Sequence, residues 1–274
     1  MQHRILAFIG AGNMSRSIIA GLVQAGYPAD RIIAANPSRP KLDALASDYG
    51  IRITQDNAEA ARAAEVIVLA VKPQLMAAML SALVAQLGTL EGKLLISIAA
   101  GIKVARLAEM AGGHGRIIRT MPNTPSLLGL GMTGLYAPPG IEQADRALAE
   151  QMMQAVGKTL GVEQESAING VIAAAGSAPA YFFLFMQAFA EEAEAMGFSP
   201  EQARLLVQQT ALGAAAMVEQ NPELSLQTLR EQVTSKGGTT AEAIKTFQQQ
   251  GLMPLTAHAM QAAVARAGEM ETLF

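Results

Sequence analysis

The chain has 274 residues, enough for one large or two modest domains, and 51% of them are hydrophobic while 16% are charged. Its formal net charge is −3 with no basic block, which argues against nucleic acid as the main partner. It has no cysteine, which excludes disulfides, redox thiols and thiolate metal sites, and its three histidines lack metal-ligand spacing. We therefore expect no metal site. We also expect a cytoplasmic protein, since residues 1–4 lead straight into an apolar segment without a signal peptide.

The segment that follows predicts the start of a dinucleotide-binding unit. The apolar run Ile5–Ile9 is typical of a strand buried on both faces, because it lacks polar alternation. Gly10 and Gly12 follow at once, and Ser15–Ala25 has helical periodicity. Gly10 allows the tight turn, and Gly12 lets the backbone approach a pyrophosphate at the helix N-terminus. Ser15 stands where a third glycine or alanine is usual, so an ordinary tight turn that binds nothing is the alternative.

Several more apolar strands are predicted along the first part of the chain, with helices between them. The strands are Arg31–Ala35, Ile51–Ile53, Glu65–Val71, Leu94–Ile98 and Arg116–Thr120, then the weaker Gly131–Ala137 and the edge strand Thr159–Val162. The helices are Pro40–Tyr49, Pro73–Leu87 and Glu142–Val156. In open α/β sheets, ligands bind beyond the carboxyl ends of the strands. We therefore expect one crevice, lined by the turns after Ile9, Ala35, Val71, Ile98 and Thr120.

The end of the second strand predicts the choice of cofactor. NAD-preferring enzymes carry an acid there that binds the ribose 2′-hydroxyl, whereas this chain has Asn36, with Ser38 and Arg39 beside it. A missing acid and a nearby arginine suit a 2′-phosphate. NADPH is therefore favoured, with NADH possible, and the alternative for Arg39 is a solvated charge at a helix start.

From residue 167 onward only helices are predicted, which gives an α/β chain of two domains. We place a Rossmann-type dinucleotide-binding domain at 1–161 and an all-α dimerisation and substrate-binding domain at 162–274. Within the long helix Ala167–Gly197, the part Val171–Met186 carries no charge, yet it is too short for a membrane span. One small domain cannot cover such a helix, so a second subunit is its expected cover. Further helices are predicted at Pro200–Glu219, Leu224–Gln232, Thr239–Gln249 and Pro254–Glu269.

A second glycine-containing segment, Val233–Thr240, opens one of these helices. We expect the N–H groups of Gly238, Thr239 and Thr240 to be unpaired at the helix start. Such a nest binds a carboxylate or a phosphate. The alternative is a Ser/Thr helix cap with glycine spacers.

Five motifs, in order along the whole chain, resemble those of pyrroline-5-carboxylate reductases. The first is shared with other Rossmann enzymes, whereas the last is quite specific to that family. Lys236 stands where proline is common in relatives. The motifs are Phe8–Met14, Ala70–Pro73, Arg119–Pro125, Gly176–Tyr181 and Val233–Thr240, the last followed by Ala243, Ile244 and Phe247.

The resemblance implies reduction of the ring C=N bond of 1-pyrroline-5-carboxylate to L-proline, the last step of proline biosynthesis, with hydride from NADPH. It implies a homodimer with interleaved helical domains, often part of a larger ring, whose active site joins the cofactor domain of one subunit and the helical domain of the other. Carried to this sequence, Ser235, Gly238 and Thr239 hold the substrate carboxylate, and the catalytic Thr240 reaches the ring nitrogen. The expected cofactor-binding residues are Gly10, Gly12, Asn13, Met14, Asn36, Ser38, Arg39, Ala70, Val71, Lys72, Pro73 and Asn123.

The residues themselves suit imine reduction and leave three alternatives. A protonated imine is already activated, so the enzyme needs mainly orientation and a donor to nitrogen. The 3-hydroxyacid dehydrogenases resemble one another in placing a catalytic lysine on the long interdomain helix, and Ala167–Gly197 contains none. Another NADPH-dependent imine reductase is harder to exclude. A non-catalytic NADP-binding sensor would have no reason to keep Ser235 and Thr240 in a nest.

Overall fold

The computed structural model describes residues 3–274, which divide into two compact units. Unit 1 runs to Ser177 and takes in the C-terminal segment Ala263–Phe274, and unit 2 is Ala178–Ala262. The change of pattern after the last predicted strand set the expected domain boundary near Gly161, and that boundary stays a prediction.

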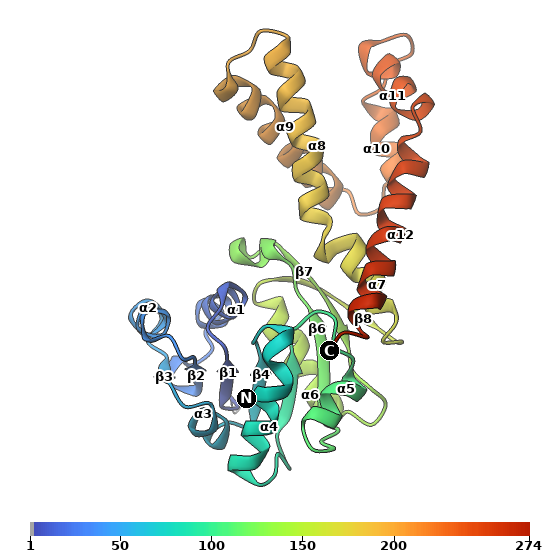
Figure 1. The fold of residues 1–274 in the computed structure, drawn as a ribbon. Helices are drawn as coiled ribbons and strands as arrows, with labels where there is room; N and C mark the ends of the chain where they lie inside the picture. The colour runs from blue at the N-terminus through green and yellow to red at the C-terminus, as the bar shows by residue number, and fades with distance from the viewer. Residues whose placement is uncertain (1–2) are drawn as a thin grey trace. The chain divides into compact units, whose positions relative to one another are not determined.

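Unit 1 contains an eight-stranded sheet in the order β3-β2-β1-β4-β5-β6-β7-β8 (Figure 1). β1 to β6 pair in parallel, β7 runs antiparallel to β6, and β8 is parallel to β7. The strand order reverses between β1 and β4, which is the switch point where such sheets bind ligands. The strands are β1 (Leu6–Ile9), β2 (Ile32–Ala35), β3 (Arg52–Thr54), β4 (Val66–Leu69), β5 (Leu94–Ser97), β6 (Ile117–Met121), β7 (Gly131–Tyr136) and β8 (Gly157–Val162).

Helices cover both faces of this sheet, so the central strands are buried and almost wholly apolar. One face packs against α1 (Asn13–Gln24), α2 (Arg39–Tyr49) and α6 (Gln143–Gln154). The other packs against α3 (Asn57–Ala63), α4 (Pro73–Leu87) and α5 (Val104–Met110). The sequence analysis missed α3 and α5, because each has only seven residues. Short 3₁₀ turns lie at η1 (Ala29–Arg31) and η2 (Thr124–Leu128).

The long helix predicted over Ala167–Gly197 contains a π-helical turn that the sequence did not predict. The segment forms α7 (Ala167–Val171), a π-helical turn η3 (Ile172–Gly176) and α8 (Ala178–Ala195). The N–H of Ser177 donates to the carbonyl of Ile172 at 2.8 Å, which closes the wider π-type ring. The chain therefore leaves unit 1 through a π-helical turn, a feature that often marks functional sites.

Unit 2 is entirely helical among its described residues. Its aromatic residues divide into two groups. Phe185 contacts Phe189 and Phe247, with ring centroids 4.9 and 6.0 Å away, whereas Phe182 and Phe183 are each 64% exposed in the single chain. The helices of unit 2, together with the fold of unit 1, confirm the predicted fold class, an α/β domain followed by an all-α domain. Besides α8, the unit contains α9 (Pro200–Gln220), α10 (Leu226–Gln232), α11 (Thr239–Gln249) and the first part of α12 (Leu252–Met270).

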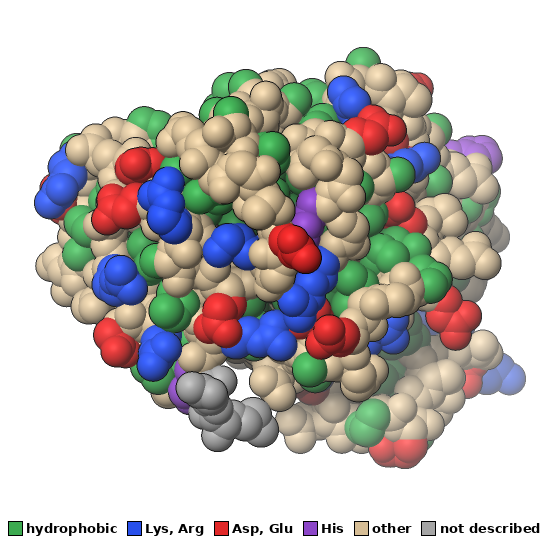
Figure 2. All heavy atoms as spheres, turned by 90° about the horizontal axis from the view of Figure 1, so that it is seen from below, with side chains coloured by type: hydrophobic (Ala, Val, Ile, Leu, Met, Phe, Trp, Pro, Cys, Tyr) green, Lys and Arg blue, Asp and Glu red, His purple; other side chains and the backbone are tan. Residues whose placement is uncertain are grey.

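Charged side chains of both signs are mixed on the face of the molecule shown in Figure 2, with apolar side chains between them.

Asp145 is fully buried and accepts hydrogen bonds from Arg4 and Arg116 at 2.6 Å each. Burial alone would raise the pKa of Asp145, but the hydrogen bonds from the two guanidinium groups outweigh it and lower that pKa. This ion pair network joins α6 to the N-terminal ends of β1 and β6.

Candidate active site: two turns that open helices

The first turn lies at the carboxyl end of β1. Gly10 has φ +113°, a conformation that side-chain-bearing residues rarely adopt, and a Cβ there would lie 2.5 Å from the carbonyl oxygen of Ala70. The N–H of Gly10 donates to the carbonyl of Ala35 at 2.8 Å. The turn is thus wedged between the ends of β2 and β4. Three of the five turns expected to share a crevice therefore do lie together.

The start of α1 has the geometry that a pyrophosphate needs. Gly12 is exposed, and a Cβ added to it would meet no atom within 4 Å. It is the N-cap of α1, no side chain caps it, and Asn13 and Met14 supply the first N–H groups of the helix. Uncapped N–H groups at a helix N-terminus bind anions, and a residue without a side chain permits close approach. These residues fit the diphosphate of a dinucleotide.

Ser15 explains the irregular fingerprint. Its side chain is buried, and its hydroxyl donates to the carbonyl of Gly10 at 2.7 Å. The hydroxyl thereby satisfies a backbone acceptor of the turn itself. The departure from glycine or alanine is compatible with the dinucleotide fingerprint and adds a hydrogen bond to it.

The end of β2 places the predicted cofactor-selecting residues beside this turn. The Asn36 amide accepts from the N–H of Ala11 at 3.2 Å and donates to the carbonyl of Ser38 at 3.3 Å. Ser38 is the N-cap of α2, and no side chain caps that helix. Arg39 pairs with Asp43 at 2.7 Å, and both side chains are more than half exposed. Exposed ion pairs are worth little, so a phosphate can recruit this guanidinium.

The loop after β4 lies beside the glycine turn. The N–H of Ala70 donates to the carbonyl of Ile9 at 3.0 Å, and Ala70 and Val71 are half-buried. Lys72 is the exposed N-cap of α4, which begins at Pro73 and has no side-chain cap. A cation and open N–H groups therefore border the glycine turn.

Asn123 differs from the other predicted cofactor residues because its amide is already engaged at both ends. It is 8% exposed, its Nδ2 donates to the carbonyl of Ala175 at 3.0 Å, and its Oδ1 accepts from the N–H of Met132 at 2.8 Å. Its amide holds the end of η3 and the start of β7, so its predicted contact with the cofactor stays a prediction.

The second turn lies in unit 2 and opens α11. The N–H of Gly238 donates to the carbonyl of Ser235 at 3.0 Å, and Gly237 has φ +73°. The expectation that the N–H of Gly238 is unpaired is therefore wrong, because a β-turn uses it. Thr239 and Thr240 are the first two residues of α11, which has no side-chain cap. Their N–H groups keep the arrangement expected of an anion site.

The hydroxyls of this second turn are available to a ligand. Ser235, Thr239 and Thr240 are exposed, and within residues 3–274 none of the three hydroxyls has a hydrogen-bond partner. A Cβ at Gly238 would lie 2.5 Å from the Ser235 hydroxyl and 3.2 Å from the Ser235 carbonyl oxygen, so a side chain there would displace that hydroxyl. Thr240 does not cap its helix, which removes the structural alternative considered for it.

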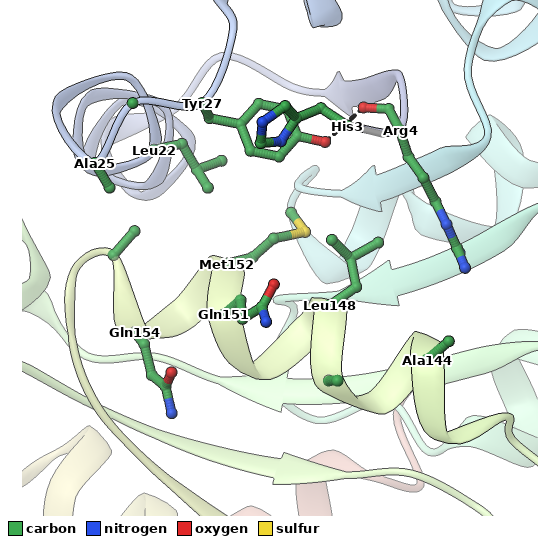
Figure 3. Close-up of a pocket in the computed structure, with 13 residues that line it drawn as sticks. His3, Arg4, Leu22, Ala25, Tyr27, Ala144, Leu148, Gln151, Met152 and Gln154 are labelled. Atoms are coloured by element: carbon green, nitrogen blue, oxygen red, sulfur yellow. Dashed lines mark hydrogen bonds between the residues drawn. The ribbon is translucent and has the colours of Figure 1, made fainter. Parts of the chain in front are cut away.

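A cavity of about 680 Å³ lies elsewhere in unit 1, between the C-terminal end of α1 and α6 (Figure 3). The Tyr27 hydroxyl donates to the carbonyl of Arg4 at 2.5 Å, and burial raises the pKa of Tyr27 to about 12. None of the predicted site residues lines this cavity. Across residues 3–274 there is also no cluster of three or more His, Cys, Asp or Glu side chains that could hold a metal ion.

Comparisons with known proteins match both halves of the chain. A family model described as "NADP oxidoreductase coenzyme F420-dependent" matches residues 5–101, and one described as "Pyrroline-5-carboxylate reductase dimerisation" matches residues 165–270. A pyrroline-5-carboxylate reductase from Vibrio alginolyticus is 59% identical over 274 residues, which are 100% of both chains.

Solved structures agree with this match. A pyrroline-5-carboxylate reductase from Coxiella burnetii superposes with a TM-score of 0.93 and is 41% identical, covering 98% of this chain and 99% of that one. The structure of Plasmodium falciparum pyrroline carboxylate reductase with NADP bound has a TM-score of 0.85 at 27% identity and covers 99% of both chains.

Proposed function

Because the chain belongs to the pyrroline-5-carboxylate reductase family, we propose that the turn in unit 1 holds the cofactor and the turn in unit 2 holds the substrate. The chain is an oxidoreductase that reduces 1-pyrroline-5-carboxylate to L-proline. One observation carries the assignment of residues: two separate helix starts lack side-chain caps, and each is preceded by a glycine with positive φ, Gly10 before α1 and Gly237 before α11.

The first turn binds NADPH in preference to NADH. The diphosphate lies on the open N–H groups after Gly12, and the cofactor, when bound, supplies the hydride for the imine carbon. The 2′-phosphate is held at the uncapped start of α2 by Ser38 and by Arg39, which gives up its exposed ion pair. Asn36 keeps this position free of the negative charge that would repel a phosphate. The other predicted cofactor residues, Asn13, Met14, Ala70, Val71, Lys72 and Pro73, border the same crevice.

The second turn holds the substrate carboxylate. The N–H groups at the start of α11 and the hydroxyls of Ser235 and Thr239 donate to its two oxygens, while Gly238 provides the close approach. The ring nitrogen is one carbon away from the carboxylate, so the Thr240 hydroxyl reaches it. There it donates a hydrogen bond and helps supply a proton as the hydride arrives.

The functional molecule is a homodimer or a larger ring of such dimers. Self-association agrees with the dimerisation family model, and the exposed phenylalanines of α8 supply an apolar surface that a single chain leaves uncovered. By length and composition alone, Ala167–Ala195 also passes for a membrane span. We favour the second copy, in the cytoplasm and without a membrane or nucleic acid partner, because this segment belongs to the dimerisation match.

The substrate site is tested by removing either a hydroxyl of the second turn or the carboxylate of the substrate. The purified chain is assayed by loss of NADPH absorbance with 1-pyrroline-5-carboxylate and with 1-pyrroline, which has the same ring but no carboxylate. Ser235→Ala is expected to lower kcat/KM for the first substrate by about tenfold, the worth of one charge-assisted hydrogen bond, and to leave 1-pyrroline unchanged. Equal losses on both substrates would contradict a carboxylate nest.

A charge on α8 tests the dimer. Phe183→Glu is expected to abolish dimer and activity together, because Phe183 has no ring partner among residues 3–274 and is 64% exposed. Phe185 is less suitable, since it packs against Phe189 and Phe247 within unit 2. An active monomer of Phe183→Glu, measured by light scattering at the assay concentration, would overturn the dimer proposal.

A further inference from the structure

The loop that follows β5, residues 98–103, stands at the same edge of the sheet as the predicted cofactor turn. We call it the β5 loop. The N–H of Ile98 donates to the carbonyl of Leu69, the last residue of β4, at 3.2 Å. The hydroxyl of Thr120 on β6 donates to the carbonyl of Ser97, the last residue of β5, at 3.0 Å. The start of the β5 loop is therefore tied to the strand ends on both sides of it.

The middle and the end of the β5 loop are held by residues from the end of the chain. Gly101 has φ +75°, and a Cβ there would lie 3.2 Å from the Cβ of Met270. Lys103, which is the N-cap of α5, pairs with Glu271 at 3.1 Å. Both partners belong to the C-terminal segment of unit 1, so this segment packs on the β5 loop.

Arg119 on β6 is the charged group that joins these supports. It is 1% exposed, and its Nη1 lies 3.0 Å from Glu165 Oε1 and 3.1 Å from Glu271 Oε1. The same Glu165 oxygen accepts from the N–H of Val104, the first residue of α5, at 2.8 Å. Burial opposes ionisation of Glu271, but the hydrogen bonds from Lys103 and Arg119 outweigh it and lower the pKa of Glu271. Two carboxylates and one buried guanidinium thus fix the point where the β5 loop enters α5.

The strand order gives the direction in which a dinucleotide crosses this edge. Sheets of this kind bind the two nucleotide halves on the two sides of the switch point. The residues proposed for the 2′-phosphate, Ser38 and Arg39, follow β2, on one side of β1, whereas β4 and β5 lie on the other side. With the diphosphate at the turn after β1, the nicotinamide half extends toward the β5 loop.

We propose that Glu271, through Lys103 and Arg119, is a positioning residue that holds the β5 loop against the nicotinamide half of NADPH. This inference rests on the proposed function, in which the first turn binds NADPH. The contacts that carry it all lie within unit 1.

The expected effect follows from how a loop's mobility limits its affinity. The apparent Kd of a ligand rises in inverse proportion to the fraction of time that its site spends in the binding position. A β5 loop that occupies this position for about a tenth of the time weakens NADPH about tenfold. A ligand that does not reach the β5 loop keeps its affinity.

The test compares two glutamates near the end of the chain. Glu271→Gln keeps the side-chain shape but replaces one carboxylate oxygen by an NH₂ group, so either Lys103 or Arg119 loses its acceptor. Glu269→Gln is the matched control, because Glu269 is 63% exposed and pairs with Arg266 at the surface. For each full-length variant, the Tm and the Kd values for NADPH and for 2′,5′-ADP are measured. The second ligand contains the adenosine and the 2′-phosphate but no nicotinamide.

We expect Glu271→Gln to raise the NADPH Kd about tenfold and to leave the Kd for 2′,5′-ADP within about twofold of the parent. Glu269→Gln should match the parent with both ligands. A parent-like NADPH Kd in Glu271→Gln would overturn the inference, and so would equal losses of NADPH and 2′,5′-ADP, which would mean that Glu271 supports the whole domain.

Two further outcomes keep the test decisive. Should Glu271→Gln fail to fold, Met270→Ala decides by the same two Kd values, because it removes packing on Gly101 without leaving a buried charge unpaired. A parent chain that binds neither NADPH nor 2′,5′-ADP would overturn the proposed function itself. A parent that binds both, with a variant that binds both equally well, would overturn only the role of Glu271.

Discussion

The two turns that open α1 and α11 each contain two glycines, but different contacts hold them in place. The first follows a buried strand, and Ala35, Ala70 and Ser15 hold Gly10 through backbone packing and hydrogen bonds. The second is exposed, and one backbone hydrogen bond, from Gly238 to Ser235, closes it. Both leave a helix start without a side-chain cap.

The difference teaches how each turn can recognise its ligand. The first presents backbone N–H groups at a fixed place, which suits a diphosphate common to all dinucleotides. The second presents three free hydroxyls, which can match the carboxylate and the nitrogen of one particular substrate. Cofactor binding should therefore depend on the backbone and substrate turnover on side chains.

The largest expected effect is at the first turn. Substitution of one of its glycines should change both stability and NADPH binding, and substitution of the other should change only NADPH binding. Gly10→Ala combines a φ of +113° with a Cβ 2.5 Å from the Ala70 carbonyl, and should abolish NADPH binding and lower the Tm. Gly12→Ala meets no protein atom within 4 Å, so its Tm should match the parent. Its NADPH Kd should rise about a hundredfold, equivalent to about 2.7 kcal/mol, because the methyl group takes the place of the diphosphate.

Titration of NADPH fluorescence and thermal unfolding check both variants. Parent-like NADPH affinity in Gly12→Ala would mean that the diphosphate does not approach this turn. The claim that the backbone of the first turn recognises the cofactor would then fail.

The first turn and its surroundings could be predicted from sequence because their signals are local. The apolar run Ile5–Ile9 and the two glycines predict the strand, the turn and the helix. The strands predicted from there through Thr159–Val162 are confirmed, with small shifts at their ends. The helix start at Thr239 is confirmed for the same reason.

Some contacts within the described residues could not be predicted from sequence, because they join distant parts of the chain or depend on backbone torsions. Arg119 pairs with Glu271, which lies 152 positions later in the sequence, and no pattern near either residue predicts the pair. The π-helical turn η3 is made of small apolar residues that fit an α-helix equally well. The pairing of the Gly238 N–H depends on the backbone torsion at Gly237, which composition does not reveal.

The next largest effect is expected at the second turn. Thr240→Val keeps the side-chain shape and loses only the hydroxyl, so kcat should fall about ten- to a hundredfold, the range of a positioned proton donor. The Tm should not change, since Thr240 makes no capping bond. Thr246→Val, on the exposed side of the same helix, is the control. Near-parent turnover in Thr240→Val would show that the proton comes from water or arrives with the substrate.

An effect of similar size, on binding instead of turnover, is expected where the first turn depends on a side chain. Arg39→Ala should weaken NADPH by about 1.5–3 kcal/mol, the worth of a charged hydrogen bond, and leave NADH nearly unchanged. Lys41→Ala removes an equal charge two positions along α2 and should change neither affinity. Isothermal titration with both cofactors measures the four values. Equal losses of NADPH and NADH in Arg39→Ala would exclude the 2′-phosphate role.

The smallest effect should come from Ser15, whose hydroxyl donates to the Gly10 carbonyl at 2.7 Å. Ser15→Ala leaves that buried carbonyl without this hydrogen bond, so NADPH binding and stability together should lose about 1 kcal/mol. Ser17→Ala is the matched control, because the Ser17 hydroxyl donates at 2.8 Å to the carbonyl of Asn13, which the helix backbone already pairs. If both serine variants bind NADPH like the parent and unfold at the same temperature, the glycine turn is held by the backbone alone, and the contrast with the hydroxyl-dependent turn of α11 becomes sharper.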